Sequence, residues 1–180
     1  MIGEDKDRGW EIFWGVYVVI LGLIFVFLVP PFQKPDEIVH WYYALALANK
    51  DSLAEKRLVD LPKRFKADKI AFHHEIRFSI DQLTYREANR EWIDFSQYRS
   101  RLINPFSYLP AIIGIWIGDY FETPIVSFWL ARLIGLIFFL MAVIWSIRVA
   151  GRTFRDLILM YAFLPMVLHQ ASSVSYDVMP

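Results

Sequence analysis

The stretch IFWGVYVVILGLIFVFLVPPFQKPDEIVH, residues 12–40, decides which fold this chain can adopt. It begins with an uninterrupted apolar run over residues 12–29, which approaches the roughly 20 residues that a helix needs to cross the hydrocarbon of a bilayer. Three prolines and the acidic pair Asp36 and Glu37 follow directly. Proline restricts the backbone, so the connection after the apolar run is expected to be rigid. This order of segments predicts a membrane span followed by two carboxylates held near the membrane surface.

The end of this first run distinguishes a membrane anchor from a secretory signal. A signal peptide has a shorter apolar region and ends in small residues at a cleavage site, whereas this run ends in the bulky sequence Phe27-Leu28-Val29. Trp10 and Trp14 stand at its start, where amphipathic rings prefer the lipid–water interface. We therefore interpret residues 12–29 as an uncleaved span.

Composition supports a membrane protein. Apolar residues make up 56% and aromatic residues 17% of the 180 residues, which exceeds the usual mix of a soluble domain. Lys plus Arg and Asp plus Glu are both 19, so net charge indicates neither nucleic acid nor an anionic surface as a partner. The chain has no Cys, which excludes disulfides and thiolate metal sites. Charged residues concentrate in residues 50–101, as in a membrane protein with one large polar loop.

Two further apolar runs predict two further spans. The second covers residues 125–147 and the third residues 157–171, with Pro165 inside the third. Because proline cannot donate its backbone hydrogen bond, Pro165 is expected to interrupt that helix. The sequence therefore predicts an all-α integral membrane fold with about three transmembrane helices.

The apolar stretch between residues 105 and 121 is shorter and more broken. Pro110, Gly114 and Gly118 interrupt it. It is shorter and more broken than an ordinary span, so we expect an interfacial or re-entrant helix rather than a crossing.

Basic residues predict the orientation of the spans. Arg148, Arg152 and Arg155 cluster in the predicted loop between the second and third spans, against the single acid Asp156. Cytoplasmic loops carry such an excess of Lys and Arg, so the large loop over residues 30–123 is expected on the external side.

The same orientation brings Asp177 to the external side, because the third span runs outward. Asp36 and Asp177 are thus expected at the same membrane face. Asp177 ends a hydrophobic helix beside a polar face, and a plain surface cap is the alternative interpretation.

The acidic pair stands at the start of a predicted helix. Apolar residues recur at three- and four-residue spacing over residues 38–49, which predicts an amphipathic helix. Carboxylates at such a position can accept from the free backbone N–H groups of the first turn. Asp36 and Glu37 are therefore candidates either for a helix cap or for chemistry at the membrane surface.

Arg132 is the charge that lies well inside the second predicted span. An Arg at a helix centre costs roughly 2.5–3.5 kcal/mol on insertion scales unless its head snorkels to the surface. Alternatively, Arg132 faces the interior of the helix bundle and holds a phosphate or a carboxylate. The carboxylates available on that side are Asp36, Glu37 and Asp177.

The sequence offers little support for a metal site. His73, His74 and Glu75 are consecutive, but adjacent residues of a strand point to opposite faces and no second cluster completes a ligand set. We predict no metal ligands and interpret this segment as solvated.

Several motifs, taken in order, resemble a known group of enzymes. The segment Pro31–Glu37, with His40 and the helix after it, resembles the first external loop of GT-C type glycosyltransferases, and the acidic pair looks like that of the protein O-mannosyltransferase branch. A closer resemblance is to a family of bacterial multi-pass membrane proteins known as domain of unknown function 2142. The stretches that carry it are Asn104–Pro110, Leu130–Leu133, Leu164–Pro165 and Ala171–Asp177.

The resemblance implies transfer of a sugar from a polyprenyl-phosphate donor at the external membrane face. In GT-C enzymes the loop carboxylate acts as a base or positions the acceptor or a metal. By that likeness Asp36 is the candidate catalytic residue with Glu37 second, His40 orients Asp36, and Arg132 binds the donor phosphate. The resemblance assigns no role to Asp177, which is a candidate substrate-binding residue because it is expected at the same membrane face. The resemblance also leaves room for a divalent cation as cofactor.

The resembling families have more spans and longer chains, so we expect residues 1–180 to be the N-terminal part of such a protein, inactive alone and completed by further spans or a membrane-protein partner. The alternative is a non-catalytic small membrane protein that assembles with a partner through its loop and helices. A transporter fragment is a weaker third interpretation, because no inverted repeat is visible.

Overall fold

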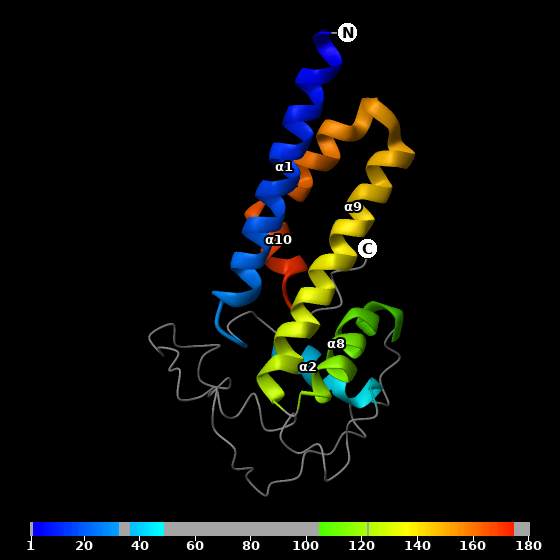
Figure 1. Cartoon of the computed structure of the whole chain (residues 1–180). Helices are drawn as coiled ribbons and strands as arrows, with labels where there is room; N and C mark the ends of the chain where they lie inside the picture. Colours follow the sequence, from blue (N-terminus) through cyan, green and yellow to red (C-terminus); the bar gives the residue numbers. More distant parts are fainter. Residues whose placement is uncertain (1, 33–36, 49–104, 122, 175–180) are drawn as a thin grey trace, which may run out of the picture.

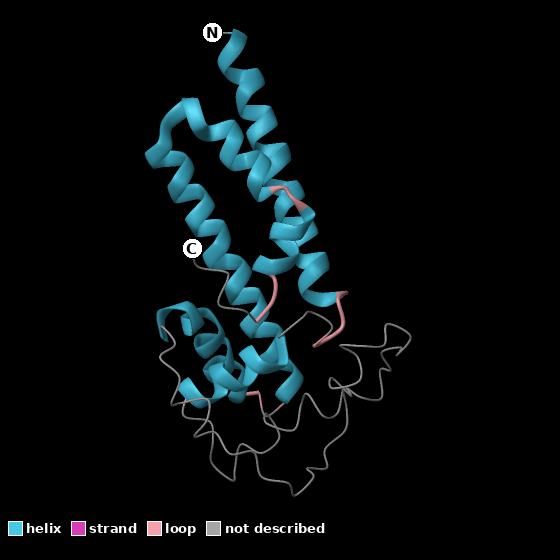
Figure 2. Cartoon of the chain, turned by 180° about the vertical axis from the view of Figure 1, so that it is seen from behind, coloured by secondary structure: helices cyan, strands magenta, loops and turns pink. Residues whose placement is uncertain are grey.

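The computed structural model describes residues 2–32, 37–48, 105–121 and 123–174 (Figure 1). In that part of the chain the elements are helices, with turn residues at some of their ends (Figure 2). In order they are α1 (Ile2–Phe27), α2 (Glu37–Leu47), the 3-10 helix η2 (Pro105–Tyr108), α8 (Leu109–Asp119), α9 (Pro124–Ala162) and α10 (Pro165–Ala171). No strand occurs among these residues, so the predicted all-α class is confirmed for the part of the chain that the structure describes.

The apolar runs form helices as expected, with different lengths. Within the described ranges, one helix, Ile125–Gly151, is long and apolar enough to cross a membrane. Phe13–Phe27 is a shorter apolar helix inside α1, which itself begins as early as Ile2. The helix predicted over residues 38–49 is α2, and the sequence placed its start within one residue.

The chain reverses direction inside α9, at Gly151. Its backbone angles are φ 68° and ψ −170°, which break the helical path. Glycine lacks the Cβ that makes positive φ costly, so it suits this turn. The expectation of a loop over residues 148–156 is corrected here, because the connection is one sharp turn with helix on both sides.

Pro165 interrupts the third apolar run, as predicted. The helix ends at Ala162, and Leu164 has an extended ψ of 123° before Pro165 starts α10. The residue before a proline is pushed toward extended backbone, which explains the break. The apolar run over residues 157–171 is therefore two helical pieces and not one continuous helix.

The helices are arranged around two antiparallel passes. α1 and the first limb of α9 run in opposite directions, and the second limb of α9 returns beside α1 (Figure 1). α2 and α8 gather at the end where α1 finishes and α9 starts. The turn at Gly151 and the start of α1 lie at the opposite end (Figure 1).

The core lies at the α2 end. Aromatic rings meet there: Phe128 of α9 has its ring centroid 4.6 Å from that of Phe32 and 5.3 Å from that of Trp41. Beyond Leu136, large apolar side chains of α9 become exposed, and Trp145 and Val149 have 68% and 71% of their surface accessible. In a membrane protein such a surface is compatible with lipid contact.

α8 packs very closely along the first turns of α9. A Cβ added at Gly114 would overlap the backbone of Ala131, and one added at Gly118 would overlap Ser127. Pairs of small residues four apart let membrane helices approach in this way. The glycines that look like interruptions in the sequence are therefore the contact surface between two helices.

Candidate functional site

Glu37 begins α2 and is buried, with 1% of its surface accessible. Its carboxylate forms a two-pronged ion pair with Arg132 of α9. Nε of Arg132 donates to Oε1 at 2.9 Å, and Nη2 donates to Oε2 at 2.7 Å. This parallel geometry is the strongest form of an Arg–carboxylate contact. The pair joins residues that are 95 positions apart in the sequence.

The remaining donors of Arg132 hold the end of the first helix. Nη1 donates to the carbonyl oxygens of Val26 and Val29 at 3.1 and 2.7 Å, and Nη2 donates to that of Pro30 at 3.3 Å. A guanidinium has five N–H donors, and these contacts use all five. The guanidinium carbon also lies 4.6 Å from the ring centroid of Phe128.

Glu37 in turn gathers two further chain segments. Oε2 accepts from the backbone N–H of Phe32 at 2.9 Å, and Oε1 accepts from that of Val174 at 3.1 Å. Each carboxylate oxygen thus accepts two hydrogen bonds, which fills its ordinary capacity. We call Glu37 and Arg132 together the clamp, because their contacts join α1, α2, α9 and the residue stretch after α10.

The clamp decides two alternatives that the sequence left open. Arg132 has no accessible surface, so the interpretation that it snorkels to the membrane surface is wrong. Its partner is one of the three carboxylates considered for it. The partners of Glu37 come from other elements and not from the first turn of α2, so its carboxylate does not act as a cap of its own helix.

The clamp also constrains the backbone near Phe32. This residue is buried and has φ 62°, which is unusual for a bulky side chain. Its N–H donates to Glu37 and its ring packs against Phe128. These two contacts hold the left-handed conformation in place.

His40 lies one turn further along α2 and is nearly buried. Its Nδ1 forms a 2.7 Å hydrogen bond with the hydroxyl of Tyr108 in η2, and which atom donates depends on the imidazole tautomer. The ring of Tyr108 also meets that of Tyr43, with centroids 6.1 Å apart. Tyr108 lies in the Asn104–Pro110 stretch, but no pattern in the sequence singles it out.

The structure brings three of the five predicted site residues to one end of the molecule: Glu37, His40 and Arg132. Asp36 and Asp177 lie outside the described residues. The roles assigned to all five stay predictions. Val174 does reach Glu37, so the chain after α10 returns to the end of the molecule that carries Glu37.

Metal-binding geometry does not occur in the described ranges, where no group of three or more His, Asp or Glu side chains could hold an ion. The segment His73-His74-Glu75 lies outside those ranges.

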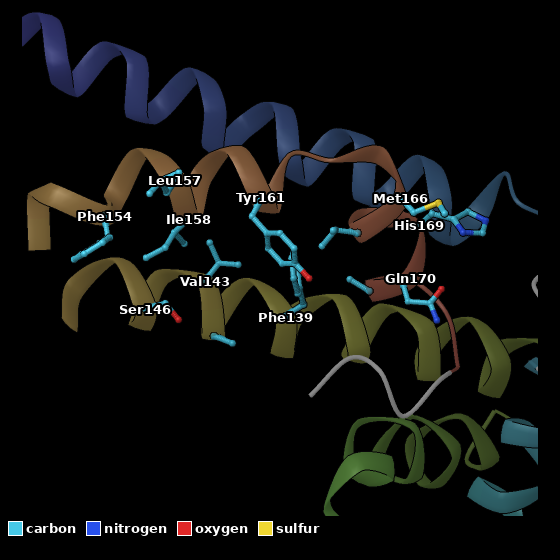
Figure 3. Close-up of a pocket in the computed structure, with 13 residues that line it drawn as sticks. Phe139, Val143, Ser146, Phe154, Leu157, Ile158, Tyr161, Met166, His169 and Gln170 are labelled. Atoms are coloured by element: carbon cyan, nitrogen blue, oxygen red, sulfur yellow. The ribbon is translucent and has the colours of Figure 1, made fainter. Parts of the chain in front are cut away.

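An apolar groove lies between the two limbs of α9 (Figure 3). Its volume is about 980 Å³. Phe139 and Val143 line it from the first limb, Leu157 and Tyr161 from the second, and α10 closes it with the stretch 166–171. His169 and Gln170 give one end of this groove a polar character, away from Phe154 at the other end (Figure 3).

Comparisons with known proteins show the family. No curated protein and no solved structure matches the chain. The model of the family described as "Predicted membrane protein (DUF2142)" matches residues 19–180, a range that includes the last turns of α1, the clamp and the groove. The chain therefore belongs to the DUF2142 family of membrane proteins.

Proposed function

We propose that this protein takes part in transferring a sugar from a polyprenyl-phosphate donor at the external face of the cell membrane. In this proposal the chain crosses the membrane several times, and the segment over residues 30–123 is external. The supporting observation is the clamp. Its two short hydrogen bonds hold the start of α2 in a defined position next to the end of the first span. Enzymes need this kind of rigid support around reacting groups.

The clamp also suggests how the two acids divide their work. A general base must have a lone pair available for the proton that it removes. Glu37 already accepts four hydrogen bonds, so its carboxylate is better suited to holding structure. We therefore assign the base to Asp36, the residue before it in the sequence, and a positioning role to Glu37.

Binding of the donor phosphate by Arg132 remains part of the proposal in a restricted form. All five guanidinium donors have partners in the structure, so a phosphate must replace one of them. The longest of these contacts, 3.3 Å to the carbonyl of Pro30, is the easiest to exchange. His40 completes the proposed site and is held by Tyr108.

Transfer of a labelled sugar from a polyprenyl-phosphate donor in membranes tests this proposal. Loss of a general base lowers rates roughly 10²–10⁴-fold, so we expect Asp36→Asn to reduce transfer to that extent without changing the amount of folded protein. Asp156→Asn is the matched control, because Asp156 is exposed just after the Gly151 turn, at the end of the molecule opposite the clamp, and should leave transfer unchanged. Full transfer by the Asp36→Asn protein would refute the assignment of the base.

A second candidate function rests on the groove. Its apolar lining and the exposed Met166 resemble a surface that another membrane helix could cover. In this alternative the protein is non-catalytic and assembles with a membrane partner. Absence of sugar transfer in membranes that contain the complete natural assembly, with the folded protein present, would favour it.

A further inference from the structure

The outward surface of η2 and α8 carries a group of exposed aromatic and aliphatic side chains. We call this group the aromatic face; it consists of Phe106, Leu109, Trp116, Ile117, Tyr120 and Phe121. Tyr120 is the most exposed of them, with 89% of its surface accessible. The opposite surface of α8, with Gly114 and Gly118, is buried against α9.

The position of this face along the membrane span follows from α9. Between Arg132 and Gly151 the helix rises about 28 Å, close to the ~30 Å thickness of the hydrocarbon layer. Arg132 also lies level with Val29 and Pro30, where the first apolar helix has ended. The hydrocarbon layer therefore fits between Arg132 and the Gly151 turn.

The pairing of α8 with α9 then fixes the depth of each residue on the aromatic face. Gly114 lies beside Ala131 and Gly118 beside Ser127, so the two helices are antiparallel. Continuing this register puts Leu109 beside Leu136, just inside the hydrocarbon, and Tyr120 beside Ile125, outside it. α8 thus crosses the boundary between hydrocarbon and headgroups.

The chemistry of the face matches that boundary. Trp and Tyr have an apolar ring and a polar group, and they gather where lipid headgroups meet hydrocarbon. The indole N–H of Trp116 already donates to the carbonyl of Ala48 at 3.2 Å, while about half of the side chain stays accessible. A ring held this way offers its apolar surface outward. A group of aromatic and aliphatic side chains that stay exposed together on one surface usually marks an interaction site.

We propose that the aromatic face binds the outer lipid–water interface of the same bilayer that α9 crosses. Trp116 links it to the end of α2 through Ala48, and the η2 residue Tyr108 links it to His40. The face therefore sets the depth at which α2 and the clamp stand relative to the lipid headgroups. This inference does not depend on any catalytic activity.

Site-directed spin labelling of the whole chain in lipid nanodiscs tests the proposal. The natural sequence has no Cys, so Leu109→Cys, Ile117→Cys and Tyr120→Cys each provide a single attachment site. All three side chains are accessible, so a label should not disturb packing. Trp145→Cys in the exposed middle of α9 and Asp156→Cys beyond the Gly151 turn supply the deep and aqueous reference values.

We expect the ratio of oxygen to nickel-complex accessibility to fall in the order Leu109, Ile117, Tyr120, between the values at Trp145 and Asp156. Equal ratios at all three sites that match Asp156 would show a face in water and overturn the proposal. Ratios that all match Trp145 would place α8 fully inside the hydrocarbon and also overturn it. Low accessibility to both reagents would mean that protein covers the face, which again contradicts lipid binding.

Discussion

At the residue scale, Arg132 shows how a membrane helix can carry a charge without exposing it. Its fork pairs with Glu37, and its other N–H groups meet the carbonyls at the end of α1, which the last turn of a helix leaves without partners. One side chain therefore satisfies a carboxylate and a helix end together.

Removing one member of the clamp should strongly lower the free energy of unfolding. Arg132→Ala leaves Glu37 buried without its counter-charge, and breaking a buried pair from one side costs about 3–5 kcal/mol. Loss of a comparable part of the free energy of unfolding, measured by denaturation in detergent, is the expected result. Arg155→Ala is the control, because its pair with the exposed Asp156 is worth less than about 1 kcal/mol. Equal effects of the two substitutions would contradict the clamp.

The hydroxyl of Tyr108 supplies a second prediction at this scale. Tyr108→Phe leaves the Nδ1 of His40 without that buried partner, so we expect a loss of about 1–3 kcal/mol in unfolding free energy. Tyr120→Phe makes the same chemical change at an exposed position and should have almost no effect. The measurement is again denaturation in detergent, and a Tyr108→Phe protein as stable as the Tyr120→Phe protein would be the contrary result.

The sequence predicted some features of these contacts but not the pairs of residues that form them. It identified Arg132 as the charge that needed an acid and offered Asp36, Glu37 and Asp177 as the choices. It could not select among them, because the pairing spans 95 positions and depends on how three helices pack. The same limit applied to the contact between His40 and Tyr108, which are 68 positions apart.

At the scale of elements, the contact between α8 and α9 depends on having no side chain at two positions. Gly118→Ala should therefore force the helices apart. Overpacking costs about 1–3 kcal/mol, and we expect at least that loss in thermal or chemical denaturation.

Gly15→Ala is the control for this substitution, because nothing lies within 4 Å of the Cβ that it would add. Alanine also favours a helix over glycine, so this protein should be as stable as the natural one or slightly more so. A Gly118→Ala protein with the stability of the Gly15→Ala protein would show that the two helices are not in close contact.

The sequence was enough to predict where these helices form, but it predicted only one of the two breaks in them. Apolar periodicity predicted α2, and the long apolar run predicted the helix within α9. Pro165 signalled its break because proline lacks a donor. Gly151 gave no comparable signal, since a single glycine is tolerated inside a helix and only the tertiary path requires its positive φ.

At the scale of the whole molecule, the fold separates two ends. One end carries α2, α8 and the clamp, and the other carries the start of α1 and the Gly151 turn (Figure 1). Charge adds a direction to this axis, because Arg148 and Arg155 lie near the turn and basic residues favour the cytoplasmic side. We therefore propose that the clamp end lies outside the cell, and the proposed sugar transfer, donor binding and contact with the outer lipid surface all depend on that placement.

Labelling of single cysteines in intact cells with a membrane-impermeant reagent tests this placement most directly. Arg90→Cys lies in the segment between α2 and η2, and Asp156→Cys lies next to the Gly151 turn. We expect labelling at position 90 in intact cells, and labelling at position 156 only after the membrane is permeabilised. Labelling at position 156 in intact cells, with position 90 protected until permeabilisation, would contradict this placement.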